Sequence, residues 1–368
     1  MNEKIAELFE IIKDYRYSDG LMSLEIIKEW IDQFDEEDRL FFLSETVHIM
    51  KKRYISETSA YEFIKIRIPY LTETNKYQTC QDFLKDVIVI DNQHEGKSQK
   101  VLLEMFYKVC RDEYNIDLQQ YKNPKAKNYL YIDDVLCTGD TLYKSLTGPI
   151  EKEFGGFFYE ESDAGKPNIT TFIENGATLR LIYFCIHQKN ITKVINRTGI
   201  KINKHPNVDL RVLIPFNYSY LGSLFIDNTE NNNSKMELLV PSIGMRNETI
   251  LQCEEHIKEK LSLVPYYREA PFFYRDDNKP DEESFFSSKE NRYRYEKILV
   301  EKCVEIYNRS NNFRNSKRPR PLGFGLNFDN SLGFGAMVFT WRNAPYNTPL
   351  VFWYKGNGWL PLFERNHT

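Results

Sequence analysis

The sequence predicts an α/β fold: a mainly parallel sheet with helices on both faces, an N-terminal helical cap and a C-terminal extension with a β-hairpin and an aromatic tail. From about residue 80, short apolar runs rich in β-branched and aromatic residues alternate with segments of helical spacing. Such alternation is typical of βαβ units, whose parallel strands are buried on both faces. The first 75 residues show only helical spacing, and the last fifty are rich in glycine and aromatic residues.

The composition bounds the class of protein. The chain has 368 residues, of which 49 are Lys or Arg, 53 are Asp or Glu, and 14% are aromatic, and its mean hydropathy is -0.54. These values exclude a membrane protein and a disordered chain. The first residues mix Glu and Lys through their apolar positions, unlike a signal or transit peptide. We therefore expect a cytoplasmic protein of about two domains with no membrane partner.

Cysteine spacing and net charge bear on the metal sites, disulfides and nucleic-acid partners that can be expected. The six cysteines lie far apart and form no CxxC motif or Cys/His cluster, so neither structural zinc nor a disulfide framework is expected. A pI near 6.0 argues against nucleic-acid binding over the whole surface. The one basic tract is RNSKRPR, Arg314–Arg320, which is either a solvated linker or a phosphate-contacting patch. Nucleic acid is an expected partner only through this tract.

Residues 1–75 predict a helical cap packed on a larger domain. Apolar residues recur at helical spacing in segments that begin near Ile5, Leu24 and Leu43. Ser23 is a candidate N-cap, and the acidic run Asp35–Asp38 favours a helix N-terminus. A helix-turn-helix is the alternative, but Lys and Arg gather on none of these helices.

Residues 76–265 predict the α/β domain, with a core at 80–220. The expected buried strands are 86–91, 128–133, 178–186 and 209–215. Two stretches rich in turn-forming residues, 155–176 and 217–236, look like insertions and are candidate lids or flexible loops.

Residues 266–368 predict a helix, the basic linker and the aromatic extension. Two GFG triplets flank NFDNS, which indicates a hairpin with its turn at Asp329-Asn330. Neither triplet completes a dinucleotide-binding motif, and the chain contains no P-loop. The aromatic tail, which includes Trp341, Trp353 and Trp359, either docks on the main domain or presents a stacking surface.

One segment carries the candidate chemistry, YLYIDDVLCTGDTLYKSL from Tyr129 to Leu146. A predicted strand ends in Asp133 and Asp134, whose carboxylates can accept hydrogen bonds from the vicinal hydroxyls of a sugar. The turn that follows contains Gly139, where backbone amides can approach an anion, and leads into a helix whose N-terminus favours phosphate. Together these features suit a ribose 5-phosphate. The alternative is an acidic pair that only caps the turn.

This segment resembles the phosphoribosyl pyrophosphate motif of type I phosphoribosyltransferases. The likeness rests on the apolar strand, the Asp133-Asp134 pair, two apolar residues and the Thr-Gly-x-Thr turn; Cys137 and Tyr131 depart from the usual pattern. The resemblance implies that Asp133 and Asp134 are catalytic, hold the ribose hydroxyls and contact Mg²⁺ indirectly, through water or substrate. It also implies that the 5-phosphate is bound by Cys137, Thr138, Gly139, Asp140 and Thr141.

A second phosphate site is expected after an earlier strand. Gly96, Lys97 and Ser98 stand between a strand and a helix about 35 residues before the main motif, and Ser98 is a candidate N-cap. Glycine permits close backbone approach and lysine supplies a positive charge. The three residues resemble the pyrophosphate loop of the same family, the alternative being an ordinary turn.

The resemblance implies a Mg²⁺-dependent enzyme that acts on phosphoribosyl pyrophosphate or a related ribose 5-phosphate or nucleotide. No general base and no acceptor pocket can be identified, so a non-catalytic ribose-phosphate sensor or regulatory subunit of a multi-protein complex is the alternative. The flanking regions look more like the phosphoribosyltransferase-like proteins of bacterial anti-phage and retron loci than like salvage enzymes, notably in TWRNAPYNTPLVFWYKGNGW. This likeness implies a defence effector with a protein partner.

Overall fold

A computed structural model describes residues 1–93, 97–148, 156–162, 165–203, 217–226, 235–265, 267–310, 313, 316–325 and 329–365. The chain divides into two compact units. Unit 1 combines Met1–Glu57 with Asp227–Thr368, and unit 2 is Thr58–Ile226. This division differs from the expected boundaries at residues 75 and 265, because the two ends of the chain pack together instead of forming separate cap and tail domains.

Unit 2 is built around a four-stranded sheet of order β2-β3-β4-β5 in which every pair is parallel. The strands are β2 (Val87–Val89), β3 (Asn128–Leu136), β4 (Thr178–His187) and β5 (Tyr218–Ile226). Its longer helices are α4 (Glu57–Thr74), α6 (Ser98–Tyr114), α7 (Asp140–Thr147) and α9 (Gln188–Asn203). The shorter ones are α5 (Cys80–Lys85), η2 (Leu118–Gln120), η3 (Phe157–Tyr159) and α8 (Asn168–Glu174). The expected α/β class is confirmed.

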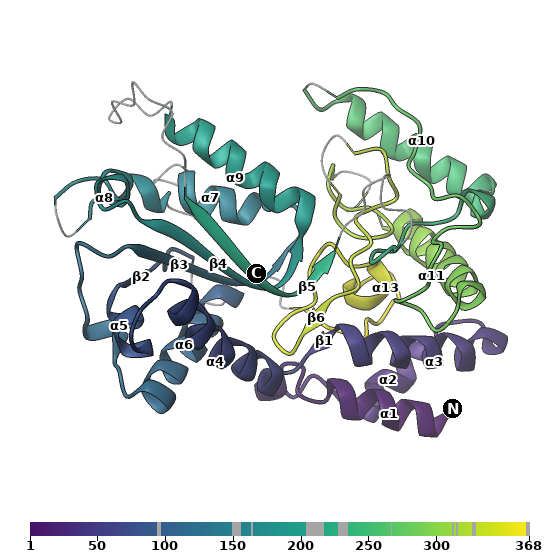
Figure 1. Cartoon of the computed structure of the whole chain (residues 1–368). Coiled ribbons are helices and arrows are strands. Elements are labelled where there is room, and N and C mark those ends of the chain that lie inside the picture. Colours follow the sequence, from purple (N-terminus) through teal and green to yellow (C-terminus); the bar gives the residue numbers. More distant parts are fainter. Residues whose placement is uncertain are drawn as a thin grey trace. The chain divides into compact units, whose positions relative to one another are not determined.

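Helices cover both faces of this sheet, as Figure 1 shows for α4 to α6 on one side and α7 to α9 on the other. Side chains alternate along a strand, so Tyr129, Tyr131 and Leu181 share one face and pack with Leu142 and Val194 of α7 and α9. On the opposite face Phe184 contacts Phe63 of α4, with ring centroids 5.3 Å apart. Burial on both faces explains why these strands carry continuous apolar runs.

The last strand of the sheet is not the one expected. Residues 209–215 lie outside the described residues, whereas β5 falls within 217–236, where the sequence predicts an insertion. Its sequence, YSYLGSLFI, mixes small and polar residues with apolar ones because most of its residues are only partly buried. The described part of the other expected insertion, 155–176, contains η3 and α8 and packs Phe158 and Phe172 into the core.

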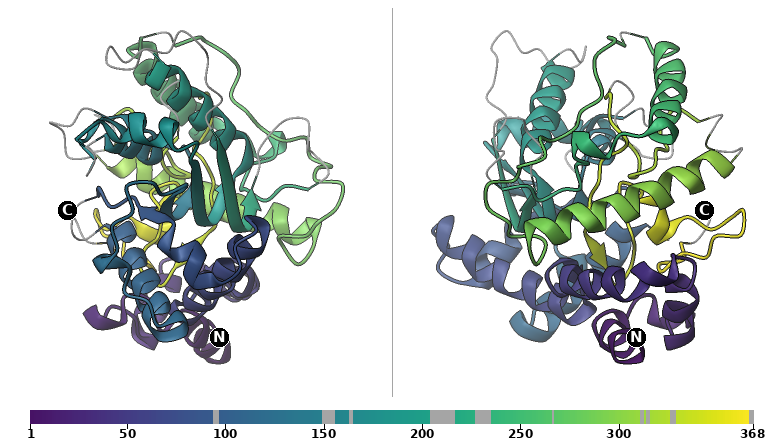
Figure 2. Two further views of the ribbon diagram at one scale, coloured as in Figure 1. Left: turned by 60° about the vertical axis from the view of Figure 1, so that its left-hand side comes forward. Right: turned by 90° about the vertical axis from the view of Figure 1, so that its right-hand side faces the viewer.

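Unit 1 joins the N-terminal helices to the C-terminal half of the chain. Its longer helices are α1 (Asn2–Ile12), α2 (Leu24–Ile31), α3 (Glu36–Arg53), α10 (Glu248–Ser262) and α11 (Lys289–Arg309). Its short elements are η1 (Tyr17–Asp19), β1 (Tyr54–Ile55), η4 (Ile243–Met245), β6 (Phe339–Thr340) and α13 (Leu350–Trp353). The expected N-cap is confirmed, since Ser23 Oγ accepts the Ile26 amide at 3.3 Å. Figure 2 shows α11 running beside the N-terminal helices, where the rings of Phe42 and Tyr295 stack at 4.3 Å.

The aromatic tail docks on the N-terminal helices, within unit 1. Trp30 Nε1 donates to the Val351 carbonyl at 2.9 Å, and Phe34 meets Trp359 edge to face at 5.5 Å. The GFG segments lie side by side through Leu322, whose amide donates to the Leu332 carbonyl at 2.7 Å. The described residues of 316–338 contain no β-strand, and residues 326–328, next to the expected turn, are outside them.

The basic tract is partly a structural element. Arg320 is 1% exposed, donates to the carbonyls of Asp329 and Ser331, and has its pKa lowered by burial. Lys317 and Arg318 are exposed, and Arg314 lies outside the described residues. The tract is therefore neither simply a linker nor a continuous basic surface. Within the described part of the chain, no helix combines the length and apolar character needed to cross a membrane.

Candidate functional site

The end of β3 and the start of α7 form the centre of the candidate site. After Leu136 the chain turns through Cys137, Thr138 and Gly139, and α7 begins at Asp140. Gly139 has a φ of 74°. A Cβ at this position would overlap Cγ2 of Val194 on α9 and lie 3.2 Å from its Cβ. The turn thus requires glycine on two independent grounds, backbone conformation and close packing.

The two adjacent aspartates have different environments. Asp133 is 6% exposed, and burial raises the pKa of its carboxyl even though hydrogen bonds from Asp134 N, Ser98, Gln93 and Tyr131 oppose the shift. Asp134 is partly exposed, and one of its oxygens accepts the Val135 amide at 2.7 Å. Of the pair, Asp134 is the more exposed residue.

The expected pyrophosphate segment is brought to the first aspartate. Ser98 Oγ donates to Asp133 Oδ1 at 3.0 Å, so the start of α6 and the end of β3 meet. The expectation that Ser98 caps α6 is wrong: Ser98 is the first helical residue, and Lys97 occupies the N-cap position without a side-chain cap. Lys97 lies directly before this contact, and Gly96 is outside the described residues.

The expected 5-phosphate segment opens an eight-residue helix. Thr138 is partly exposed and Thr141 is exposed, and the Asp140 amide points to Thr138 Oγ1 at 3.5 Å. Asp140 pairs with Lys144 at 2.8 Å and with Arg197 of α9 at 3.7 Å. These two cations offset the negative charge of Asp140, which would otherwise oppose an anion at the helix N-terminus.

Cys137 contributes through its backbone. Its side chain is buried, and burial raises the pKa of the thiol well above its usual value, so the thiol stays protonated. The Cys137 carbonyl accepts a hydrogen bond from the Asn190 side chain, Nδ2, at 2.8 Å. The backbone amide of Asn190 donates to His187 Nδ1 at 3.2 Å. The first residues after β4 therefore fix the turn that precedes α7.

The roles of three residues of this site could not be predicted from the sequence. Gln93 and Tyr131 contact Asp133, and Arg197 contacts Asp140 and lies 3.6 Å above the Tyr143 ring. Tyr131 stands out in the sequence only as a bulky residue in the strand. Gln93 and Arg197 give no local signal, because their roles depend on contacts between segments at least 38 residues apart.

The residues present fit a magnesium ion in one limited way. Mg²⁺ keeps several waters and is usually held by one or two carboxylates together with substrate phosphates. Asp134 has the exposure and the charge for this mode. Among the described residues no group of three or more His, Cys, Asp and Glu side chains is placed to hold a metal ion.

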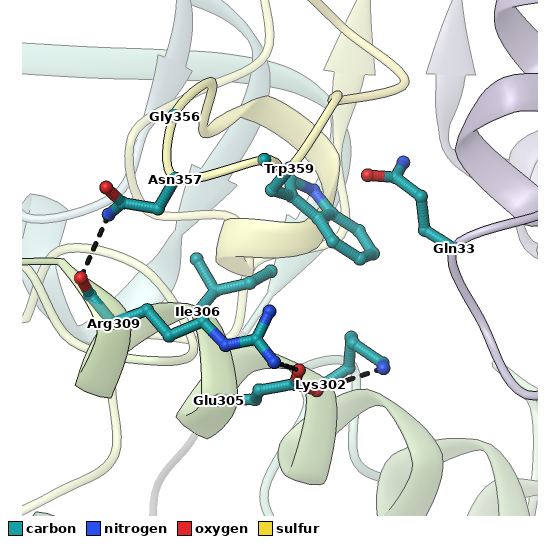
Figure 3. Close-up of a pocket in the computed structure, with 9 residues that line it drawn as sticks. Gln33, Lys302, Glu305, Ile306, Arg309, Gly356, Asn357 and Trp359 are labelled. Carbon is teal, nitrogen blue, oxygen red and sulfur yellow. Dashed lines mark hydrogen bonds and ion pairs between the residues drawn. The ribbon is translucent and has the colours of Figure 1, made fainter.

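A pocket of about 120 Å³ lies in unit 1, between α11 and the turn at Gly356–Trp359 (Figure 3). Its two cations, Lys302 and Arg309, both pair with Glu305. The turn is tied to α11 by Asn357 Nδ2, which donates to the Arg309 carbonyl at 3.1 Å. These ion pairs and this hydrogen bond are explained by the packing of the C-terminal turn against α11.

Comparison with known proteins places the chain in a family. A family model described as PRTase-CE matches residues 27–365. No curated protein and no solved structure matches the chain. The matched range spans both units and includes β2, β3, α6 and α7, which supply the candidate site. The chain therefore belongs to the PRTase-CE family, a phosphoribosyltransferase-like family.

Proposed function

We propose that the protein is a Mg²⁺-dependent enzyme that acts on phosphoribosyl pyrophosphate or a related ribose 5-phosphate compound. The observation that carries the proposal is the meeting of two segments at one sheet edge. A partly exposed carboxylate, Asp134, is followed by the glycine turn into α7, and the Lys97-Ser98 segment is tied to the same strand end through Asp133. Membership of a phosphoribosyltransferase-like family supports this assignment.

Each segment has a role in this proposal. Asp134 accepts hydrogen bonds from the ribose hydroxyls, and the amides and hydroxyls of Thr138–Thr141 hold the 5-phosphate. Lys97 supplies positive charge to the pyrophosphate. Mg²⁺, when bound, supplies further charge to neutralise the leaving pyrophosphate. The bond between C1 of the ribose and the pyrophosphate oxygen breaks, and pyrophosphate leaves. An incoming nucleophile, either a base nitrogen or water, forms the new bond to C1.

The protein's contribution to such a reaction is largely positioning. Holding the ribose and both phosphate groups fixes C1 with respect to the nucleophile and lowers the entropic part of the barrier. Fixed amide dipoles and charges stabilise the charge that develops as the bond breaks. A protein with the same contacts but no turnover would act as a ribose-phosphate sensor, the second candidate. The engagement of Asp133 with four protein donors favours that candidate, because it leaves one carboxylate for the sugar.

The experiment that tests the proposal titrates the full chain with phosphoribosyl pyrophosphate and Mg²⁺ and then follows pyrophosphate release. If the protein is an enzyme, it should bind phosphoribosyl pyrophosphate and release pyrophosphate. Asp134→Asn should then remain folded but release no pyrophosphate. The matched control is Asp112→Asn, an exposed aspartate on α6, which behaves as wild type. Binding without release identifies the sensor, and the absence of binding contradicts both candidates.

The biological setting we propose is bacterial anti-phage defence, with a protein partner. The support is the resemblance of the segment TWRNAPYNTPLVFWYKGNGW, Thr340–Trp359, to the terminal segment of the phosphoribosyltransferase-like proteins of bacterial anti-phage and retron loci. We expect the protein, expressed with its neighbouring genes, to lower phage plaque counts, and Asp134→Asn to abolish that protection. Equal protection by the variant would contradict an enzymatic effector.

A further inference from the structure

Asp133 is engaged by four donors of the protein itself. Its Oδ1 accepts the Ser98 hydroxyl at 3.0 Å and the Asp134 amide at 2.9 Å. Its Oδ2 accepts Gln93 Nε2 and the Tyr131 hydroxyl, each at 3.3 Å. An ionised carboxylate has about four acceptor positions. All of them are used, and the residue is 6% exposed, so Asp133 has no oxygen left for a sugar hydroxyl.

The donors come from three separate segments. Gln93 belongs to the loop after β2, Ser98 begins α6, and Tyr131 lies on β3 two residues before Asp133. The Tyr131 hydroxyl also accepts Gln93 Nε2 at 2.8 Å and lies 3.4 Å from Ser145 Oγ of α7. One buried cluster, which we call the Asp133 clamp (Gln93, Ser98, Tyr131 and Asp133), thus ties the start of α6 to the end of β3.

We propose that Asp133 is a positioning residue, which acts with Tyr131 and Gln93 to hold the pyrophosphate-binding segment against the ribose-binding strand, and that Asp134 alone contacts the ribose. This inference rests on the proposed function and divides the roles of the two aspartates, which a reading of the motif treats as equivalent. The clamp acts on the segment that includes Lys97 and Ser98. Its loosening should weaken the binding of a ligand that carries pyrophosphate more than that of ribose 5-phosphate.

The chain offers a matched pair of substitutions. Tyr129 and Tyr131 lie on the same strand and the same face, and both are 0% exposed. The Tyr131 hydroxyl belongs to the clamp, whereas the Tyr129 hydroxyl has no hydrogen-bond partner among the described residues. Tyr131→Phe and Tyr129→Phe therefore remove the same atom from equally buried rings, and only the first removes a clamp contact.

The experiment measures the Kd of phosphoribosyl pyrophosphate and of ribose 5-phosphate, with Mg²⁺ present, for wild type and both variants. Because hydrogen bonds to a charged group are among the stronger ones, Tyr131→Phe should raise the Kd of phosphoribosyl pyrophosphate about tenfold. It should change the Kd of ribose 5-phosphate by less than about twofold, and Tyr129→Phe should change neither. Should Tyr131→Phe fail to fold, Gln93→Met removes the other donor to Oδ2 and is expected to discriminate in the same way.

The outcomes separate this inference from the function on which it rests. If Tyr131→Phe matches Tyr129→Phe, or weakens both ligands equally, Asp133 is not a positioning residue for the pyrophosphate segment. Loss of ribose 5-phosphate binding in Asp134→Asn shows in the same assay that the site itself is correct. If wild type binds neither ligand, the proposed function fails and the inference fails with it. A kinetic readout adds a check, since Tyr131→Phe should raise KM for phosphoribosyl pyrophosphate more than it lowers kcat.

Discussion

Gly139→Ala tests whether the turn into α7 has the conformation described above. Alanine at a φ of 74° is strained by roughly 1–2 kcal/mol. The new Cβ would also overlap Val194 Cγ2, and overpacking of this kind costs about 1–3 kcal/mol. We therefore expect unit 2 to lose about 2–5 kcal/mol of stability, and ribose 5-phosphate to bind more weakly because the start of α7 must move.

A second substitution separates the two causes. Val194→Ala removes the methyl group that the new Cβ would meet, at a cost of about 2 kcal/mol for its own lost packing. The double variant should be more stable than the sum of the single effects by about 1–3 kcal/mol, the overpacking contribution. It should remain about 1–2 kcal/mol less stable than Val194→Ala, because the backbone strain at residue 139 persists.

The assay must report on unit 2. The four tryptophans, Trp30, Trp341, Trp353 and Trp359, all belong to unit 1, so their fluorescence does not follow the sheet. Amide hydrogen exchange in β3 and β4, read by mass spectrometry of their peptides, measures the relevant opening free energy. The reasoning is refuted if Gly139→Ala lies within about 0.5 kcal/mol of wild type, or if the effects of the two substitutions simply add.

Three further predictions concern buried polar groups. Gln99→Met should stabilise unit 2 by about 1–3 kcal/mol in the same exchange assay, because Gln99 is 0% exposed and neither polar atom of its amide has a hydrogen-bond partner among the described residues; a loss of stability would refute this. Arg320→Met should destabilise unit 1 by about 2–3 kcal/mol in urea unfolding followed by tryptophan fluorescence, since it removes the donor to the buried Ser331 carbonyl and to the partly buried Asp329 carbonyl. The exposed control Arg318→Met should stay within about 0.5 kcal/mol. Burial, with Lys52 nearby, lowers the pKa of His48, so the unfolded chain takes up this proton at a higher pH than the folded one. Unit 1 should therefore lose stability as the pH falls from 7 through the ordinary histidine pKa, and should lose less in His48→Gln; equal losses would contradict the shift.

The parts of the site that could be predicted from the sequence are those whose residues are consecutive. Asp133, Asp134 and the Thr-Gly-x-Thr turn fall within one strand, one turn and one helix start, so the local pattern predicts which elements carry them. The burial of Asp133 could not be predicted, because it depends on Gln93 and Ser98, which stand 40 and 35 residues away in the chain. The sequence pattern shows which residues are present, but not which of them are already hydrogen-bonded to one another.

The fold, too, could be predicted only where its features depend on consecutive residues. Buried strands with uninterrupted apolar runs, such as β3 and β4, are recognisable, whereas the less buried β5 is not. The joining of the chain ends in unit 1 rests on contacts such as that between Trp30 and Val351, which are 321 residues apart. No local pattern carries that information, because apolar periodicity identifies a face that is buried but not the segment that covers it.

The central claim, that the end of β3 binds a ribose phosphate through Asp134, is tested most directly by one measurement. Calorimetric titration of the full chain with phosphoribosyl pyrophosphate and Mg²⁺ should show saturable binding for wild type and for Asp112→Asn. The same titration should show no binding, or binding weakened by at least about tenfold, for folded Asp134→Asn. Equal affinity in wild type and Asp134→Asn, or no binding to wild type, would contradict the account.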